Sequence, residues 1–483
     1  MHVVFVASEA APWSKTGGLG DVAGALPRYL AARHAKVTLI LPDYSEPAAT
    51  RPPEAVVSAQ AHVNVGGTAY PVTFRTLSLT PRLKVVWVGQ ELMFHRAFLY
   101  GDGARPYPDN LVRFLVFQLG VMAWIHSSRR RVDLVHANDW QTALLPLMLD
   151  RNPPRRGRPA TVLTIHNLHY QGVFPGHFFA LLDLPGEYFS PDNLEFFGNI
   201  NCLKAGIIFS DAITTVSPTY AREILKPEYG AGLEGVLRRY QHKLRGILNG
   251  ADYSVWDPRS DPHIYRTYGK QDALTGKRIN RTALMQELGL DWPLHIPLGV
   301  AVTRLAHQKG ADILTRALAR LAPESMRAVI LGTGDPGLEK GLRHLAAANP
   351  GICFIPRFSE PLAHRLQAAA DLFLMPSRYE PCGLAQIYAL RYGTIPVVRR
   401  TGGLADTITD ADTAKEGTGF LFDRPHAAGL FRALKRAIRA VSEPSRLARL
   451  RATSMACDFS WDRAATNYAE LYGRILSNGD QHE

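Results

Sequence analysis

Short runs of β-branched and aliphatic residues alternate with amphipathic helical segments along the whole chain, and this alternation limits the possible folds more than any other feature. Six runs occur in the first half, at residues 2–8, 36–42, 83–89, 132–138, 161–167 and 212–217. Six more follow at residues 298–305, 327–334, 352–358, 372–377, 394–400 and 418–422. Because most runs are apolar at odd and even positions alike, both faces of each strand should be buried. The pattern predicts an α/β fold with parallel sheets between layers of helices.

The two sets of strands are separated by a segment with many Gly, Asn, Asp and Pro residues, "LRGILNGADYSVWDP". We therefore expect two doubly wound, Rossmann-like domains, at residues 1–247 and 248–459, facing an interdomain cleft. A last helix, within about residues 460–480, follows the final strand and is expected to pack back on the first domain. In open parallel sheets, ligands bind beyond the carboxyl ends of the strands, so functional residues should follow the strands directly.

The charge and the cysteines argue against several classes of protein. The net charge is +12, but the basic residues are scattered and do not alternate with aromatic ones, so we expect no nucleic-acid partner. The four cysteines form no C-x-x-C pair, which argues against structural zinc and disulfides. The N-terminus lacks the basic segment of an export signal. The longest apolar stretch, residues 111–125, contains Arg113 and should be a buried helix, so we expect a cytoplasmic protein without a membrane partner.

The first strand is followed by "WSKTGGLGDV", a glycine turn before a predicted helix. Gly17 and Gly18 would let another group approach the backbone closely, and Lys15 adds a positive charge. A helix that begins there directs free N–H groups toward the turn. These residues and Asp21 thus outline an anion site, although a plain β–α turn explains the ten residues equally well.

Further candidate residues follow the other strands or, for Asn249, lie in the crossover segment. They are Asp139, His166, Asn167, Asn249, Arg304, Lys309, Glu380, Cys382, Gly383, Leu384, Thr401, Gly402 and Gly403. Taken singly, each has an ordinary explanation, since surface cations are usually solvated and glycines usually turn the chain. Together, three cations and three glycine turns are expected at one cleft, where Arg304 and Lys309 would suit a diphosphate.

Two other motifs are expected to be misleading. Gly332, Gly334 and Gly337 have the G-x-G-x-x-G spacing of a dinucleotide site, with Glu360 further on. However, they follow the second strand of their domain, and Pro336 stands where the helix should begin. Asp410 and Asp412 have the D-x-D spacing of metal-dependent sugar transferases but lie after a helix, in an apparently solvated turn. We therefore expect no cofactor and no catalytic metal.

Several longer segments resemble one known family. They are "KTGGLGDV", "HANDWQTALLP", "LTIHNLHYQG", "INCLKAGI", "TTVSPTYAREI", "GILNGAD", "TRLAHQKG", "SRYEPCGLAQIYALRYGTIPVVRRTGGLADT" and "GTGF". In this order they are similar to bacterial glycogen synthases and plant starch synthases, retaining glucosyltransferases of the GT-B fold. The resemblance runs from about residue 2 to about residue 470. It implies transfer of glucose from ADP-glucose to the non-reducing end of an α-1,4-glucan such as glycogen, with the acceptor on the first domain and the donor on the second.

The resemblance also implies roles for the candidate residues. Lys15 resembles the lysine that binds the nucleotide sugar, Arg304 and Lys309 the phosphate clamp, and Glu380, with Cys382 beside it, the acid that holds the donor glucose. His166 and Asn167 resemble the glucose-pocket pair, Asn249 the crossover asparagine, and Asp21 and Asp139 acidic positions of the cleft. Phe358 stands where an aromatic residue is expected near the adenine, but Arg357 replaces the usual glycine before it. Tyr388 occupies the place of a second glutamate found in other GT-B enzymes.

No second carboxylate accompanies Glu380 in the sequence pattern, so we expect displacement on one face of the sugar rather than a double displacement. Three alternatives remain open on the residues alone. They are a GT-B enzyme that acts on a small acceptor, an inactive glucan-binding relative, and a dehydrogenase that uses the Gly332 motif. UDP-glucose also remains open as the donor, and we expect a monomer or a small homo-oligomer.

Overall fold

The structure is a computed structural model that describes residues 1–45, 49–103 and 105–479. The chain divides into two compact units. The first contains Met1–Val216, Ala221–Ile247 and the segment from Trp461 onward, and the second contains Ser217–Tyr220 and Leu248–Ser460. The second boundary, between Ile247 and Leu248, lies within the Gly- and Asn-containing segment that separates the two sets of strands.

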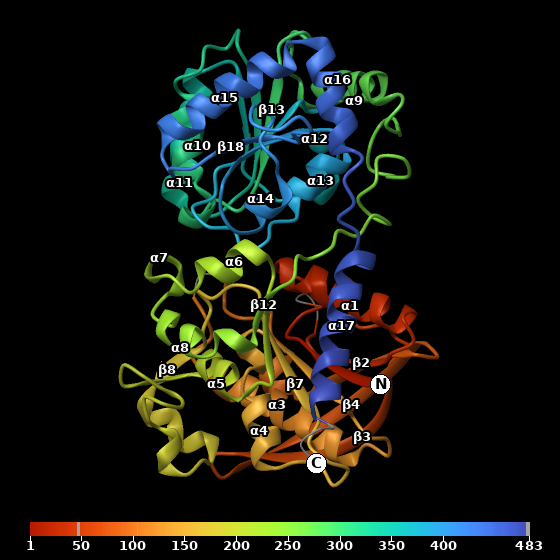
Figure 1. Cartoon of the computed structure of the whole chain (residues 1–483), viewed down its shortest axis with the longest axis vertical. Helices are drawn as coiled ribbons and strands as arrows, with labels where there is room; N and C mark the ends of the chain where they lie inside the picture. The colour runs from red at the N-terminus through yellow and green to blue at the C-terminus, as the bar shows by residue number, and fades with distance from the viewer. Residues whose placement is uncertain (46–48, 104, 480–483) are drawn as a thin grey trace. The chain divides into compact units, whose positions relative to one another are not determined.

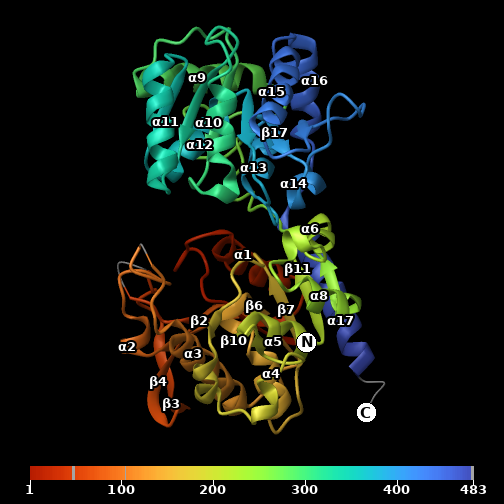
Figure 2. The ribbon, with the colours of Figure 1, turned by 90° about the vertical axis from the view of Figure 1, so that its left-hand side faces the viewer.

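The first unit is built on a nine-stranded sheet with the order β12-β11-β7-β6-β1-β2-β5-β4-β3 (Figures 1 and 2). Its strands are β1 (His2–Val6), β2 (Lys36–Pro42), β3 (Val56–Val65), β4 (Thr68–Thr80), β5 (Leu83–Gly89), β6 (Leu134–Asn138), β7 (Ala160–Ile165), β11 (Ala212–Thr215) and β12 (Leu244–Gly246). All neighbours from β12 to β5 pair in parallel, and all six predicted strands of this half form. The α/β class expected from the alternation is confirmed.

The strands β3 and β4 form an antiparallel hairpin that the pattern did not predict. The hairpin extends the sheet beyond β5 and lies at its edge in Figure 2. Gly66 and Gly67 make its two-residue turn, with φ of 55° and 79°. Such a turn fits the twist of antiparallel strands and favours glycine at both positions. A Gly-Gly pair between two alternating segments was therefore a readable hairpin signal.

Helices cover both faces of this sheet. They are α1 (Gly18–Ala32), α2 (Glu91–Phe94), α3 (Asn110–Ser127), α4 (Leu145–Arg151), α5 (Cys202–Phe209), α7 (Pro227–Gly230), α8 (Glu234–Arg239) and α17 (Trp461–Gly479), while α6 (Pro218–Glu223) contains a unit boundary at Tyr220. A small sheet of β8 (Val173–Pro175), β9 (Glu195–Phe196) and β10 (Asn199–Asn201) is inserted between β7 and α5. The expected apolar helix is α3, in which the buried Arg113 donates to the carbonyl oxygens of Met93 and Leu99. Among the described residues, no helix has both the length and the apolarity needed to cross a membrane.

The last helix, α17, packs in the first unit, beside α1 (Figure 1). Trp461, Tyr468 and Tyr472 are almost completely buried in a core shared with β1 and α1. The hydroxyl of Tyr472 lies 2.6 Å from Nδ1 of His136, a buried residue of β6. This core and this contact join the end of the chain to its first strands.

The second unit contains a six-stranded parallel sheet with the order β15-β14-β13-β16-β17-β18. Its strands are β13 (Leu298–Val302), β14 (Arg327–Leu331), β15 (Ile352–Ile355), β16 (Leu372–Met375), β17 (Ile395–Arg399) and β18 (Phe420–Phe422). Its helices are α9 (Ala273–Leu288), α10 (Ala311–Leu318), α11 (Pro336–Ala348), α12 (Glu360–Ala369), α13 (Ala385–Arg391), α14 (Gly402–Thr407), α15 (Ala427–Val441) and α16 (Pro444–Ser454). All six predicted strands form, in the classic order of a Rossmann fold.

The strand β14 is buried on both faces. Ala328 and Ile330 pack with α10, α11 and α15, whereas Val329 and Leu331 pack with α9 and α12. Figure 1 shows these two groups of helices on opposite sides of the sheet. The near-continuous apolar runs of the sequence therefore reflect burial between two helical layers.

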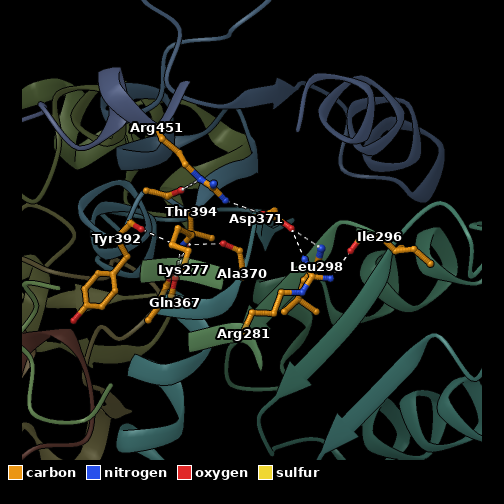
Figure 3. Close-up of polar contacts among 12 residues, drawn as sticks. Lys277, Arg281, Ile296, Leu298, Gln367, Ala370, Asp371, Tyr392, Thr394 and Arg451 are labelled. Atoms are coloured by element: carbon orange, nitrogen blue, oxygen red, sulfur yellow. Dashed lines mark hydrogen bonds and ion pairs between the residues drawn. The ribbon is translucent and has the colours of Figure 1, made fainter. Parts of the chain in front are cut away.

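A buried polar network ties α9 to the amino ends of the strands (Figure 3). Lys277 donates to the carbonyl oxygens of Gln367 and Tyr392 and to the hydroxyl of Thr394. Asp371, just before β16, accepts from Arg281 (3.0 Å) and Arg451 (2.8 Å). Burial lowers the pKa of Lys277 well below its usual value. Because ligands of such sheets bind at the carboxyl ends, we assign this network to stability.

Candidate active site

In the second sheet the strand order reverses between β13 and β16, which makes their carboxyl ends the expected ligand position. Two predicted residues meet there. Lys309, in a short 3-10 turn after β13, places Nζ 2.9 Å from Oε1 and 2.6 Å from Oε2 of Glu380, which follows β16. Ser377 donates to Oε2 of Glu380 at 2.9 Å. Glu380 is only 5% exposed, so this carboxylate is held by a cation and a hydroxyl with little water around it.

The loop after β17 supports the backbone of Glu380. The amide of Gly403 donates to the carbonyl oxygens of Glu380 and Pro381, at 3.1 and 3.2 Å. A Cβ on Gly402 would overlap the carbonyl oxygen of Glu380, and Gly402 also has a positive φ of 44°. Thr401 is fully buried in front of these glycines. The two predicted glycines are thus required by the close approach of two loops.

Replacing Gly402 by alanine should displace the Glu380 loop, because the added Cβ and the positive φ are both unfavourable there. We expect glucosyl transfer to fall at least about tenfold and the free energy of unfolding to fall by about 1–3 kcal/mol. The matched control is Gly341→Ala on α11, where a Cβ meets nothing within 4 Å and alanine favours the helix. Equal activity and stability of the two variants would contradict this role of Gly402.

Cys382, Gly383 and Leu384 lie between Glu380 and α13. Burial raises the pKa of the Cys382 thiol to about 12, so this sulfur is a poor nucleophile at neutral pH. Gly383 has a φ of 70° and turns the chain into α13. Asn249 is 5% exposed, and within the described part of the chain its Oδ1 has no hydrogen-bond partner. An unpaired acceptor in a buried position is costly unless a ligand supplies a donor.

Two predicted residues of the second unit are exposed. Arg304 follows β13, and Phe358 follows β15 at the edge of the sheet. Phe358 is 75% exposed, which is unusual for a phenylalanine. Both side chains are open to a ligand, but no described contact joins either of them to the Lys309–Glu380 pair.

In the first unit, Lys15 lies in the loop after β1 and forms an ion pair with Asp21 of α1, with Nζ 2.7 Å from Oδ1. Gly17 is the N-cap residue of α1 and Gly18 is its first residue. A Cβ on either glycine would meet nothing within 4 Å. Unlike Gly402, these glycines leave open space beside the lysine, as an approaching ligand would need.

Asp139, His166 and Asn167 come together after β6 and β7, next to the reversal of strand order between β1 and β6. Oδ1 of Asp139 accepts from the amide of His166 at 2.7 Å, and Asp139 adopts a φ of 57°. Burial raises the pKa of Asp139 to about 7, although the hydrogen bonds that it accepts from the amides of His166 and Asn167 lower it. Burial lowers the pKa of His166 to about 3, so this ring is neutral at neutral pH. Its Nε2 lies 2.9 Å from Oδ1 of Asn138.

Sequence reasoning missed three residues that hold candidate site residues in place. Asn138 contacts His166, Ser377 contacts Glu380, and Glu9 binds the loop of Lys15. Asn138 orients His166 and also donates to the carbonyl oxygen of Val6. Both Asn138 and Ser377 stand directly at strand ends, the position that should have been searched residue by residue. Glu9 also directly follows the predicted run 2–8, but it belongs to no recognised motif.

Two glycines of the apparent dinucleotide motif, Gly332 and Gly334, are explained by local contacts within the protein. The amide of Gly334 and the hydroxyl of Thr333 donate to Glu339, so a carboxylate of the protein occupies the place of a phosphate. A Cβ on Gly332 would overlap the carbonyl oxygen of Thr303. The sequence argument that Pro336 disfavours a helix start was wrong. Pro336 is the first residue of α11, a position where a missing backbone N–H costs nothing.

The interpretation of Asp410 and Asp412 as a solvated turn was wrong for Asp410. Asp410 is 5% exposed and accepts from the amide of Leu421 and from Arg436. Asp412 binds Arg436 and Arg446. The pair joins the loop before β18 to α15 and α16, and its carboxylates are used in ion pairs. Within the described residues, no group of three or more His, Cys, Asp or Glu side chains could hold a metal ion.

Comparison with known proteins gives consistent matches over the chain. A family model described as "Starch synthase catalytic domain" matches residues 2–239, and one described as "Glycosyl transferases group 1" matches residues 295–450. The glycogen synthase of Anaeromyxobacter sp. (strain Fw109-5) is 46% identical over 482 residues, covering 99% of this chain and 100% of that protein. Glycogen synthase 2 of Nitrosococcus oceani is 43% identical, covering 98% and 97%.

Solved structures agree. The catalytic domain of starch synthase IV from Arabidopsis thaliana, bound to ADP and acarbose, has a TM-score of 0.90 and 32% identity, with 99% of each chain covered. A sucrose-phosphate synthase from Thermosynechococcus elongatus has a TM-score of 0.63 at 17% identity, which indicates a shared fold only. The first likeness confirms the expected GT-B fold with two Rossmann-like sheets.

Proposed function

Because the chain belongs to the glycogen synthase and starch synthase family of glycosyltransferases, we propose that it transfers glucose from ADP-glucose to the non-reducing end of an α-1,4-glucan, with retention of configuration. The observation that carries this proposal is the ion pair of the half-buried Lys309 with the buried Glu380 at the strand-order reversal of the second sheet. The related starch synthase was solved with ADP, which supports a nucleotide diphosphate donor.

The second unit would bind the donor. Arg304 and Lys309 supply the positive charge that a departing diphosphate needs, since its negative charge grows as the glycosidic bond breaks. Glu380 would bind a hydroxyl of the donor glucose and favour positive charge on its ring. The unpaired Oδ1 of Asn249 would accept from a sugar hydroxyl, and the exposed Phe358 offers a face for stacking the base.

The first unit would contribute Lys15, with open space at Gly17 and Gly18, and the pocket of Asp139, His166 and Asn167. A neutral His166 can donate or accept a hydrogen bond without repelling a cationic sugar ring. Its backbone carbonyl, next to the Asp139 contact, would add a partial negative charge near that ring. The pocket would thus stabilise an oxocarbenium-like transition state.

The side chains that contact Glu380 indicate the stereochemical course of glucosyl transfer. Retaining hydrolases use two carboxylates about 5 Å apart. Glu380 instead faces a lysine and a serine hydroxyl. We therefore favour a displacement in which the acceptor attacks the face that the diphosphate leaves.

The test is a transfer assay with labelled ADP-glucose or UDP-glucose and glycogen, measuring label in the precipitated polymer. We expect label from ADP-glucose, preference over UDP-glucose, and no loss of activity with a chelator. Label only in a small acceptor would favour the alternative of a small-molecule glycosyltransferase. Absence of transfer together with tight glycogen binding would favour an inactive glucan-binding relative.

A further inference from the structure

The loop that carries Lys15 is anchored by Glu9, a buried residue just after β1. Glu9 is 3% exposed. Its Oε2 accepts from the amide of Thr16 at 2.6 Å and from the hydroxyl of Thr16 at 2.7 Å. Its Oε1 accepts from the amide of Gly20 at 3.2 Å. One carboxylate therefore holds the loop on both sides of Gly17 and Gly18.

The same carboxylate caps α1. The N-cap residue, Gly17, has no side chain to bind the free amides of the first turn. Glu9 does this from outside the helix, by accepting from Gly20, and its negative charge suits the positive end of the helix dipole. The start of α1, and with it the position of Lys15 and of its partner Asp21, thus depends on Glu9.

Burial makes the ionised form of Glu9 expensive. It raises the pKa of Glu9 to about 7, although the hydrogen bonds from Thr16 and Gly20 lower it. The titratable or charged groups that face it are Asp21 from α1, Asp139 from the end of β6, Tyr44 and Tyr100, with Arg113 acting on Tyr44. Most of these are acidic, so they do not compensate the charge of Glu9.

The ionised form of Glu9 makes the strongest contacts with the loop. A carboxylate anion accepts all three hydrogen bonds, whereas a neutral group at this position keeps only part of the acceptor capacity and accepts weaker bonds. A neutral amide in place of the carboxylate would also bring N–H donors against the two amides and the hydroxyl. The anchoring therefore depends on the carboxylate.

We propose that Glu9 is a positioning residue, whose ionised carboxylate holds the Lys15 loop in the conformation that binds the nucleotide sugar. This inference rests on the role proposed for Lys15. Loss of this carboxylate therefore loosens the loop and weakens donor binding, while the chemistry at Glu380 is unchanged.

The first test measures the loop itself, by hydrogen exchange of peptides spanning residues 13–22 at pH 8, where most of Glu9 is ionised. In Glu9→Gln, which cannot become an anion, we expect protection to be roughly tenfold or more lower than in the wild type. Glu54→Gln, at an exposed position, is the control and should behave as the wild type. Equal protection in the wild type and Glu9→Gln would overturn the proposal.

The second test measures KM and kcat with ADP-glucose at pH 8. KM should be higher in Glu9→Gln than in the wild type, with kcat less affected. Thr16→Val keeps Glu9 but removes one bond to its charged form, so KM should rise there too, but by less than in Glu9→Gln. This variant also serves if Glu9→Gln does not fold.

The two tests separate the inference from the proposed function. Altered exchange with an unchanged KM would overturn the link between Glu9 and donor binding. No transfer from ADP-glucose by the wild type would instead contradict the proposed function, and the exchange result would be unaffected.

Discussion

Replacement of Lys309 by alanine is expected to lower kcat/KM for glucosyl transfer by about a thousandfold or more. The change removes the cation proposed to stabilise the leaving diphosphate, and a single preorganised charge of this kind contributes about 3–4 kcal/mol to transition-state binding. It also leaves Glu380, 5% exposed, with only the hydroxyl of Ser377 as a side-chain partner among the described residues. Without Lys309, the carboxylate of Glu380 should be held less firmly and should bind the donor glucose less well.

Steady-state kinetics with ADP-glucose and glycogen would measure the effect, with thermal unfolding to show that the variant is folded. Lys340→Ala, at an exposed position of α11, is the matched control. Because Lys309 and Glu380 are in contact, the double variant with Glu380→Gln should lose less activity than the product of the two single losses. Near-normal turnover of Lys309→Ala would remove this lysine from the mechanism.

Ending the chain at Ser460 is expected to prevent the first unit from folding. The deletion removes a buried stripe of α17, whose large members are Trp461, Tyr468, Leu471 and Tyr472. At about 1.5–3 kcal/mol for each large side chain, their burial contributes about 6–12 kcal/mol. That is comparable with the whole stability of a typical domain, about 5–15 kcal/mol. The truncated protein should therefore be insoluble or unfolded at 25 °C.

Soluble yield, circular dichroism and urea unfolding would check this expectation. A milder variant, Tyr472→Phe, removes only the hydroxyl next to Nδ1 of His136 and should cost about 1–3 kcal/mol, because it leaves a buried polar atom without its partner. Arg474→Ala, on the exposed side of α17, should change little. A truncated protein that unfolds cooperatively with wild-type stability would show that α17 is dispensable.

The β-branched runs predicted twelve strands, and all twelve form, because parallel strands buried on both faces need apolar residues at every position. The hairpin of β3 and β4 was missed although it carries a readable turn at Gly66 and Gly67. Its strands are largely exposed, so they lack the continuous apolar runs by which the other strands were identified. Runs that are apolar at every position mark strands buried on both faces, whereas a strand with one face in water shows only alternation.

The candidate residues were found by a simple rule, that polar residues directly after strands belong to the site. The rule located Glu380 and Lys309 before their contact was known, but it gave no reason for Gly402. Only the folded chain shows that Gly402 must lack a side chain because the backbone of Glu380 passes beside it. The same applies to Asp410, which looked like a solvated turn and is buried among arginines.

What the sequence determined by itself was the class of fold, the order of the strands along the chain and the chemical types available at their ends, because these depend on local patterns of polarity. What the tertiary structure alone decided was which of these groups touch and how strongly each is desolvated. Glu9 illustrates the difference: in the sequence it is one carboxylate among 43 acidic residues, and in the fold it is buried under three hydrogen bonds with a pKa of about 7. Burial and contact arise from residues far apart in the chain, and no local pattern records them.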